Sequence, residues 1–193
     1  MGDTPSSPGR RRADARRNRD RLVTAASAVI AESGAEASLE EIARRAGVGS
    51  ATLHRHFPTR AGLLEAVLRD RVQVLCTRAE DLLAAPDAGA ALVTWLRAVV
   101  AHAADVRGFG PALVGYELAP EFSPHTMITE AARKLLTRAR QHGSVAATLT
   151  VDDLLQLANG IALGIESLPD PAQRGHRLLT LVASGLLRRA DDR

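Results

Sequence analysis

The side chains that could perform catalysis or bind a metal are few and scattered along the chain. His54 and His56 are two residues apart on an expected helix, so they point to different faces and make poor metal partners. The other four histidines also lack the spacing of metal ligands: His102, His125, His142 and His176. The one cysteine, Cys76, has no histidine in a nucleophile arrangement, and no Gly-rich phosphate loop or Gly-x-Ser-x-Gly motif occurs. We therefore expect neither an enzyme nor a bound metal or cofactor.

Polar side chains gather instead in one short stretch, Ser50 to Phe57, with the sequence SATLHRHF. Leu53 and Phe57 are four residues apart and would form the buried face of a helix that Ser50 can cap. The other face carries small and polar residues, which suit contacts with an external partner rather than with a core. These residues are Ala51, Thr52, Arg55 and His56, with His54 beside them.

The residues before this stretch predict another short helix. Ser38 is a good N-cap, and Glu41 follows it at the spacing of a capping box. Apolar residues then recur at helical spacing on one face: Leu39, Ile42, Ala43 and Ala46. Gly47 can end the helix with a positive φ angle, and the apolar Val48 would hold the turn against a core. Two helices joined by a short Gly-containing turn form the helix-turn-helix pattern, whose second helix enters the DNA major groove.

The run from about Asn18 to Leu68 resembles the DNA-binding domain of TetR-family transcriptional regulators. The agreement is at fixed spacing and comprises Ser38, Ile42-Ala43, Ala46-Gly47-Val48, Thr52-Leu53, His56-Phe57 and Leu63-Leu64. The sequence departs from the family at His54, where Tyr is usual, and at Gly49, where Ser is common. Thr59-Arg60 stands where the family usually has Ser-Lys. The resemblance implies DNA contacts from Ser38, Gly49, Ser50, Ala51, Thr52, His54, Arg55, His56, Thr59 and Arg60.

The composition favours a helical protein inside the cell. Of 193 residues, 46% are hydrophobic but only 3% are aromatic, which predicts an aliphatic core built from helices. No apolar run approaches the length needed to span a bilayer, no secretory signal is visible, and one cysteine excludes an intrachain disulfide framework. We therefore expect a soluble, cytoplasmic protein.

Positive charge is concentrated in the N-terminal part of the chain. Residues 1–60 carry 11 arginines against 7 acidic residues, whereas the net charge of the whole chain is only +3. This is the electrostatic footprint of a nucleic-acid binder. One group of arginines would lie at the start of the first helix, where the resemblance implies an approach to the DNA backbone: Arg16, Arg17, Arg19 and Arg21. Three more lie in the preceding tail, which could follow a minor groove or remain solvated: Arg10, Arg11 and Arg12.

The periodicity predicts an all-α fold with about nine helices and no strand. We expect a disordered basic tail at 1–13, a three-helix DNA-binding domain of the helix-turn-helix type at 14–60, and an effector-binding and dimerisation domain at 61–193. Glycine and proline at 108–111 would interrupt the helical pattern. Helices outside the helix-turn-helix are expected at Asp14 to Ser33, Arg60 to Ala84, Ala88 to Ala104, Ala112 to Ala119, Ser123 to His142, Asp152 to Ser167 and Ala172 to Arg189.

The last two predicted helices, about 152–167 and 172–189, are apolar on more than one side. This favours a two-fold, four-helix dimer interface over a larger monomeric core. The C-terminal half also resembles the regulatory domain of TetR-family proteins, from Asp153-Leu154-Leu155 to Gly160-Ile161-Ala162. The resemblance implies a homodimer on a palindromic DNA operator, with a small-molecule effector that moves the Arg60 to Ala84 helix. Candidate residues for the effector pocket combine apolar bulk with polar groups: Trp95, His102, Phe109, Tyr116, Glu117, His125, Met127 and Asn159.

Two other interpretations remain open at this point. A non-specific architectural DNA-binding protein would bind with an affinity set by salt alone. A metal-sensing or redox-sensing regulator of the same fold is disfavoured by the single cysteine and the unclustered histidines. The sequence leaves open the operator, the effector and the sign of regulation, with repression as the tendency of the family.

Overall fold

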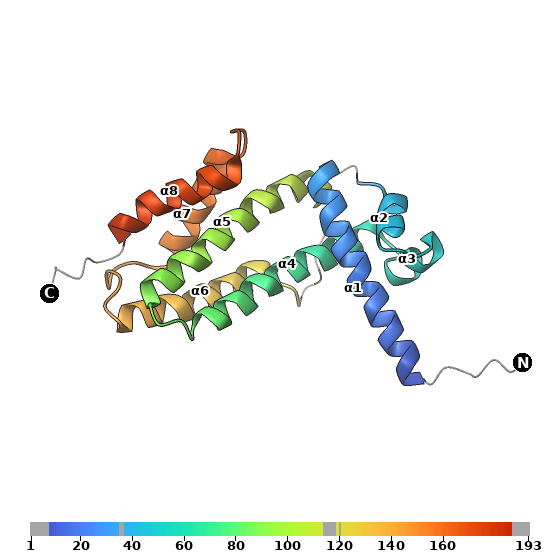
Figure 1. The fold of residues 1–193 in the computed structure, drawn as a ribbon, viewed down its shortest axis with the longest axis horizontal. Helices are drawn as coiled ribbons and strands as arrows, with labels where there is room; N and C mark the ends of the chain where they lie inside the picture. Colours follow the sequence, from blue (N-terminus) through green and yellow to red (C-terminus); the bar gives the residue numbers. More distant parts are fainter. Residues whose placement is uncertain (1–7, 35–36, 114–118, 120, 187–193) are drawn as a thin grey trace, which may run out of the picture. The chain divides into compact units, whose positions relative to one another are not determined.

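The computed structural model describes residues 8–34, 37–113, 119 and 121–186 (Figure 1). These residues form eight α-helices and no β-strand, which confirms the predicted all-α class. The helices are α1 (Pro8–Ser33), α2 (Leu39–Arg45), α3 (Ser50–His56), α4 (Arg60–Leu82), α5 (Ala88–Leu113), α6 (Pro124–Gln141), α7 (Val151–Ile165) and α8 (Pro171–Leu186).

The first helix begins earlier than the sequence predicted. α1 starts at Pro8 rather than at Asp14, so the expectation of disorder is wrong for residues 8–13. Proline is favourable at the start of a helix, because its φ angle is already helical and its missing N–H would be unpaired there. The arginines from Arg16 to Arg21 therefore lie about two to four turns inside α1 rather than at its N-terminal end.

The interruption predicted around Gly108 is also absent, because α5 continues to Leu113. Glycine costs a helix only about 1 kcal/mol relative to alanine, and a long helix that is already packed tolerates that cost. Pro111 lies in the last turn of α5, where few hydrogen bonds follow it. Of the separate helix expected at 112–119, the first two residues belong to α5 and residues 114–118 lie outside the described part.

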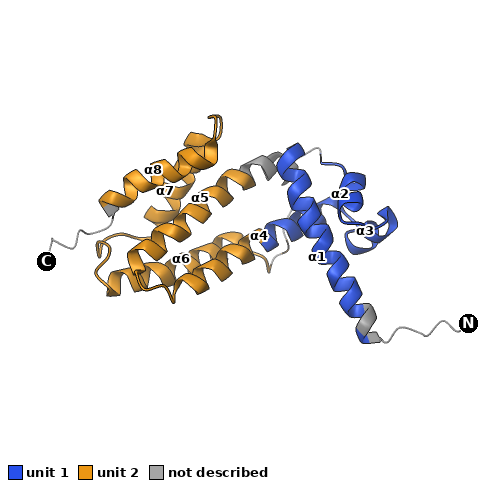
Figure 2. Ribbon diagram, in the orientation of Figure 1, with its two compact units in different colours: residues 1–70, 108–118 blue, residues 71–107, 119–193 orange. Residues whose placement is uncertain are grey.

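The chain forms two compact units (Figure 2). Unit 1 comprises residues 1–70 and 108–118, and unit 2 comprises residues 71–107 and 119–193. The division in α4 falls after Asp70, later than the predicted boundary at residue 60. The reason is that the first turns of α4 pack into the core of unit 1, so α4 begins in unit 1 and ends in unit 2.

The core of unit 1 is mostly aliphatic and joins α1, α2, α3 and the first turns of α4. Leu22 of α1, Ile42 of α2 and Leu53 of α3 are each no more than 1% exposed. Phe57, directly after α3, adds one buried aromatic ring. α4 contributes Leu63, Leu64, Ala66 and Val67 to the same cluster. Burial of this apolar surface positions the two short helices, which are too short to be stable alone.

The core of unit 2 surrounds Trp95 on α5, which is 0% exposed. The Nε1 atom of Trp95 donates a hydrogen bond to the Leu75 carbonyl oxygen of α4 at 3.0 Å, so its polar atom is satisfied inside the core. α6, α7 and α8 close the core with aliphatic side chains: Leu135, Leu136, Leu154, Ala158, Ile165 and Leu179.

The sequence was expected to contain no apolar run long enough to span a bilayer, and residues Ala88–Val106 of α5 correct that expectation. In the described part of the chain, this stretch is the one helix long and apolar enough to cross a membrane by length and composition. The core helix of a globular protein passes the same test. Trp95 and Leu96 at its centre are buried in unit 2, which accounts for its apolar composition.

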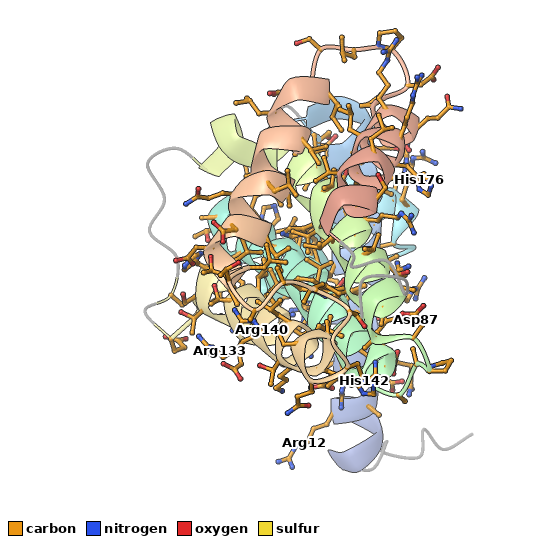
Figure 3. All side chains as sticks on the ribbon, turned by 90° about the vertical axis from the view of Figure 1, so that its left-hand side faces the viewer. Arg12, Asp87, Arg133, Arg140, His142 and His176 are labelled. Carbon is orange, nitrogen blue, oxygen red and sulfur yellow. The ribbon has the colours of Figure 1, made fainter. Side chains whose placement is uncertain are left out.

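Three helix ends in unit 2 match their local sequence signals. Ser123 caps α6 by accepting a hydrogen bond from the Thr126 N–H. After α6 the chain turns through His142 (Figure 3), and Gly143 there has a φ angle of +65°. Thr150 and Asp153 form a capping box at the start of α7, and the hydrogen bonds from Thr150 lower the pKa of the Asp153 carboxyl.

Candidate nucleic-acid interface

The helix-turn-helix predicted for residues 38–57 is present as α2, a turn and α3. Ser38 is the N-cap of α2, and its Oγ accepts a hydrogen bond from the Glu41 N–H at 3.4 Å. The Glu41 carboxylate does not complete the predicted capping box, because it binds two arginines instead. Gly47 has a φ angle of +64°, as a glycine at this helix end was predicted to have. The Val48 N–H then donates to the Ala43 carbonyl oxygen at 3.0 Å, which closes the turn.

α3 presents one buried and one exposed face. Leu53 is 1% exposed and Phe57 is 4% exposed, so these two residues attach α3 to unit 1 as predicted. The N-cap is Gly49, without a side-chain hydrogen bond, and Ser50 is the first helical residue rather than the cap. The predicted contact residues on and before α3 lie at the surface: Gly49, Ser50, Ala51, His54 and Arg55 are exposed, and Thr52 and His56 are half-buried.

An ion-pair network joins α1 to α2. The Arg45 guanidinium binds both carboxylate oxygens of Glu32 on α1, at 2.7 and 2.6 Å. The Nε atom of Arg45 also donates to Glu41 at 2.7 Å. Arg44 binds both oxygens of Glu41 at 2.8 and 2.7 Å. Bidentate pairs of this kind restrict geometry as well as adding attraction. Sequence reasoning missed the network, although the Glu41 spacing to Arg44 and Arg45 was visible within α2.

The network lowers the pKa of both carboxyl groups, Glu41 and Glu32. Hydrogen bonds from Arg44, and then from Arg45, lower the pKa of Glu41 to about 2 from 4.5. The Arg45 hydrogen bond lowers the pKa of Glu32 as well. A carboxyl whose pKa is lower in the folded than in the unfolded state stabilises the fold above its unfolded pKa. That contribution is lost as the pH falls through the folded pKa.

We therefore predict that Glu41→Gln lowers the thermal midpoint of the protein above pH 4.5, where the Glu41 carboxylate is charged in both states. The difference between Glu41→Gln and wild type should shrink as the pH falls from 4.5 towards 2. Circular dichroism melts across this pH range measure the effect. Glu40→Gln is the matched control, because Glu40 lies beside Glu41 on α2 and forms no ion pair among the described residues. A constant difference at all pH values would contradict the role of the charge.

Two arginines of α1 lie against the helix-turn-helix. The Arg19 guanidinium stacks over the Phe57 ring, 4.9 Å from its centroid, at the end of α3. The Arg21 guanidinium lies over Gly47, where an added Cβ atom would come within 2.4 Å of its Nη2 atom. Gly47 thus provides space as well as the positive φ angle, although the φ angle is the larger constraint because an arginine end can move. The resemblance placed this arginine group near DNA without indicating these contacts.

The last two predicted DNA-contact residues, Thr59 and Arg60, also have roles inside unit 1. Thr59 precedes α4, and its Oγ1 accepts a hydrogen bond from the Gly62 N–H at 3.1 Å. The Arg60 Nη1 atom donates to the Ala37 carbonyl oxygen at 2.8 Å, just before α2. Substitution of Arg60 would therefore disturb the entry to α2 as well as any phosphate contact. A residue on the outer face of α3 is a cleaner test of DNA binding.

Comparisons with known proteins identify this arrangement. Residues 22–67 match the family model described as bacterial regulatory proteins of the tetR family, and residues 87–188 match the C-terminal domain of SbtR-like transcriptional regulators. The chain belongs to the TetR family. It is a DNA-binding transcriptional regulator, and the family and fold are those of regulators rather than enzymes. TetR-family regulators bind DNA and are typically dimeric with small-molecule ligands.

Three similar proteins illustrate the extent of the match. The crystal structure of the TetR regulator SCO0520 from Streptomyces coelicolor is 37% identical, with a TM-score of 0.79, over 89% of this chain and 99% of that one. A TetR regulatory protein from Mycobacterium vanbaalenii is 34% identical, with a TM-score of 0.72, over 92% of this chain and 99% of that one. The transcriptional repressor KstR2 of Mycolicibacterium smegmatis is 35% identical over 82 residues, which are 42% of this chain and only 37% of that relative.

The effector-pocket residues predicted for this TetR-family chain differ in exposure where the structure describes them. Trp95 is a core residue, and its Nε1 atom is hydrogen-bonded within the protein. His102 is half-buried, and burial, followed by the nearby Arg71, lowers its pKa. Met127 is half-buried, whereas His125 and Asn159 are exposed. The predicted side chains of Phe109, Tyr116 and Glu117 lie outside the described part.

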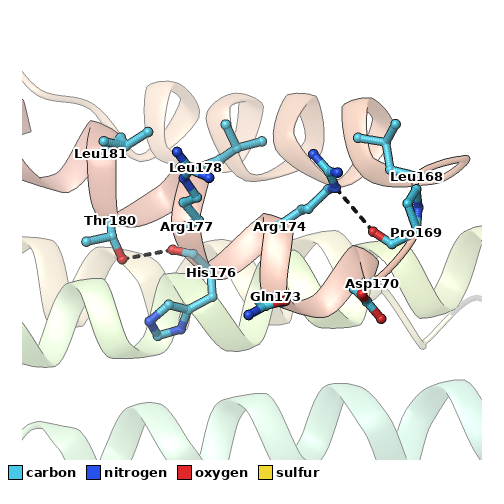
Figure 4. Close-up of a pocket in the computed structure, with 10 residues that line it drawn as sticks. All are labelled: Leu168, Pro169, Asp170, Gln173, Arg174, His176, Arg177, Leu178, Thr180 and Leu181. Carbon is cyan, nitrogen blue, oxygen red and sulfur yellow. Dashed lines mark hydrogen bonds between the residues drawn. The ribbon is translucent and has the colours of Figure 1, made fainter.

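A hollow of about 920 Å³ lies elsewhere on unit 2, along α8 and the turn that precedes it (Figure 4). Two hydrogen bonds shape it: the Arg174 Nε atom donates to the Pro169 carbonyl oxygen at 3.2 Å, and the Thr180 hydroxyl donates to the His176 carbonyl oxygen at 2.8 Å. Leu168, Leu178 and Leu181 line the same hollow and are exposed. None of the predicted effector residues lines it.

Cys76 and the histidines show little that suits metal or redox sensing. Burial, followed by the nearby Glu80, raises the pKa of the Cys76 thiol, which favours the unreactive protonated form. Its Sγ atom lies 3.8 Å from the Met127 carbonyl oxygen. Within the ranges that the structure describes, no group of three or more His, Cys, Asp or Glu residues could hold a metal ion.

Proposed function

We propose that the protein is a transcriptional repressor that binds a palindromic operator as a homodimer and is released by a small-molecule effector. The observation that carries the proposal is the α3 face. Leu53 and Phe57 hold α3 in the unit 1 core, while His54 and Arg55 are exposed and Thr52 is half-buried. A helix of this kind reads base edges in the major groove. The relative KstR2, which is named as a repressor, supports the direction of regulation.

Dimerisation is proposed through α7 and α8. Four leucines on these helices and in the turn between them are strongly exposed: Leu163 at 59%, Leu168 at 40%, Leu178 at 40% and Leu181 at 62%. Together we call them the leucine surface. Gly160 and Gly164 of α7 have open space where a Cβ would stand, so a second helix could approach closely. Large apolar side chains grouped at a surface favour a protein partner. A second copy of the same surface would bury them in a two-fold interface.

The effector is proposed to bind in unit 2, and α4 is proposed to carry the signal because it runs through both units without a break. In a dimer, two α3 helices must lie about 34 Å apart to read successive turns of one DNA face. An effector that binds more tightly to a state with a different spacing lowers the affinity for the operator. The size of this effect is the difference in the effector's binding free energy between the two states, typically about 1–3 kcal/mol. We infer that this regulation takes place in the cytoplasm, where the chromosome is accessible.

The proposed function is tested by mixing the purified full-length protein with fragmented genomic DNA and sequencing the bound fraction at near-physiological salt. Recovery of a palindromic sequence would support the specific dimeric regulator. Genes beside the recovered sites would indicate the chemistry of the effector. Binding without any shared sequence motif would favour a non-specific architectural protein, whose affinity depends on salt alone.

Thr52→Ala should weaken binding to the recovered operator about tenfold while leaving binding to random-sequence duplex unchanged, because a base contact carries sequence information and a phosphate contact does not. Fluorescence anisotropy with labelled duplexes measures both affinities. Thr77→Ala is the matched control, since Thr77 is an exposed threonine on α4 in unit 2. An equal loss on both duplexes would remove Thr52 as a base-reading residue.

A further inference from the structure

α4 and α5 lie against each other inside unit 2, along a line of contact that we call the seam. Within the core, the Trp95 Nε1 atom donates to the Leu75 carbonyl oxygen at 3.0 Å. Further along, the Arg71 Nη1 atom donates to the Asp105 Oδ2 atom at 3.1 Å, and we call these two residues the seam pair. The earlier residue of α4 meets the later residue of α5, so the two helices run antiparallel at the seam.

The seam pair lies where both helices reach the limit of unit 2. Unit 2 begins at residue 71 on α4, and its part of α5 ends at residue 107. The Arg71 side chain is only 15% exposed, whereas that of Asp105 is 62% exposed. The guanidinium is therefore largely enclosed, and the carboxylate reaches it from the surface. The seam pair thus attaches α4 to α5 at the point where α4 enters unit 2.

A half-buried histidine, His102, lies beside the seam pair. It precedes Asp105 by three residues on α5, a spacing that places two side chains next to each other on one helix face. Burial, followed by the positive charge of Arg71, lowers the pKa of His102, whereas the charge of Asp105 raises it. Among the described residues, no charged group of α6, α7 or α8 contributes to this shift. His102 is therefore mainly neutral at about pH 7 and gains a proton on acidification.

We propose that the seam is an acid-sensitive switch in which His102 and Arg71 compete for the Asp105 carboxylate. While His102 is neutral, Asp105 binds Arg71 and joins α5 to α4, which we call the joined state. When His102 takes a proton from solvent, its charge repels Arg71 and attracts Asp105. The pair between two helices is then exchanged for a pair within α5, and α4 is released from α5 at this end of unit 2.

The direction of the pH dependence follows from the lowered pKa of His102. A base whose pKa is lower in the joined state than in the released state favours the joined state at high pH. This preference is complete above the ordinary pKa of 6.5 and is lost as the pH falls through the lowered value. One proton per protomer changes the equilibrium by at most about tenfold per pH unit. The effect on DNA rests on the proposed function of α4: a released α4 holds the α3 spacing less firmly, so acid weakens operator binding.

The first arm of the test follows the seam without DNA, through the emission of Trp95 in the full-length protein. The Trp95 indole is hydrogen-bonded across the seam, and it is the one indole in the chain. Between about pH 7.5 and about pH 5, wild type should show a shift to longer wavelength that His102→Gln lacks. His142→Gln is the matched control and should behave as wild type, because His142 is an exposed histidine at the end of α6 in the same unit. Far-ultraviolet circular dichroism verifies that all three proteins remain folded, and equal profiles for wild type and His102→Gln would overturn the proposal.

The second arm measures affinity for the duplex recovered by genomic selection. The ratio of wild-type to His102→Gln affinity should fall about tenfold between about pH 7.5 and about pH 5.5, and this ratio cancels the titration of His54 and His56, which both proteins carry.

A further variant, Asp105→Asn, removes the seam pair at every pH. It should bind the duplex weakly even at about pH 7.5, and its affinity should change with pH no more than that of His102→Gln. A constant affinity ratio, or wild-type affinity in Asp105→Asn, would overturn the proposal. Failure to recover any preferred duplex would count against the proposed function instead, and the emission of Trp95 would still decide whether the seam responds to acid.

Discussion

Leu163→Glu combined with Leu181→Glu should convert the proposed homodimer to a monomer and weaken binding to the proposed operator at least about 100-fold. These two leucines are the most exposed members of the leucine surface, at 59% and 62%. An interface that buries them would have to bury carboxylates without partners, which is strongly unfavourable. Loss of the dimer removes the second recognition helix, and with it the gain of about 10²–10⁴ that two linked sites provide. Analytical ultracentrifugation and anisotropy with labelled operator measure the two effects.

Val74→Glu provides the matched control for this experiment. Val74 is an apolar residue of α4 that is 60% exposed, and it lies outside the leucine surface. The same charge is introduced there, but the protein should remain dimeric and bind operator normally. A double variant that remains dimeric would show that the leucine surface is not the subunit interface. A wild-type protein that sediments as a monomer would contradict dimerisation itself.

Leu53→Ala should abolish specific DNA binding by releasing α3 from unit 1. Leu53 is 1% exposed and is one of two residues that hold the seven-residue α3 in the core. Removal of a buried leucine side chain typically costs about 2–5 kcal/mol, because it leaves a cavity as well as losing apolar burial. A helix of this length has no stability without its packing. Far-ultraviolet circular dichroism during denaturation and operator binding measure the loss.

Val74→Ala controls for the removal of an aliphatic side chain from an exposed helical position, and it should change stability by less than about 0.5 kcal/mol. The leucine surface is untouched in Leu53→Ala, so the variant should still sediment as a dimer. Operator binding close to that of wild type would show that α3 does not depend on Leu53 for its position. Loss of the dimer would indicate that unit 2 cannot fold when unit 1 is destabilised.

The helix-turn-helix was predictable because its signals are local. Ser38 as a cap, Gly47 with its positive φ angle, and the Leu53–Phe57 spacing each act within one or two helical turns. The same holds for the Thr150 capping box of α7. In these elements the residues that decide the structure are close together in the sequence, so the sequence pattern predicts the fold.

Other features depend on which helices meet, and here sequence reasoning failed. Arg45 and Glu32 are 13 residues apart, and their pairing requires α1 and α2 to be placed side by side. The burial of Trp95 also depends on which helices pack around α5, and its residue type alone does not indicate it. The start of α1 at Pro8 was hidden because Gly, Pro, Ser and Arg residues there resemble a disordered tail in composition.

The position of Trp95 determines what fluorescence can report about this protein. It is the one tryptophan in the chain, it lies at the centre of the unit 2 core, and its indole is shielded from water. Its emission should shift to longer wavelength when unit 2 opens and remain unchanged while unit 1 alone unfolds. A denaturation curve followed only by tryptophan emission would therefore miss the loss of α3. If the unfolding transitions followed by tryptophan emission and by circular dichroism do not coincide, the two units unfold separately within one chain.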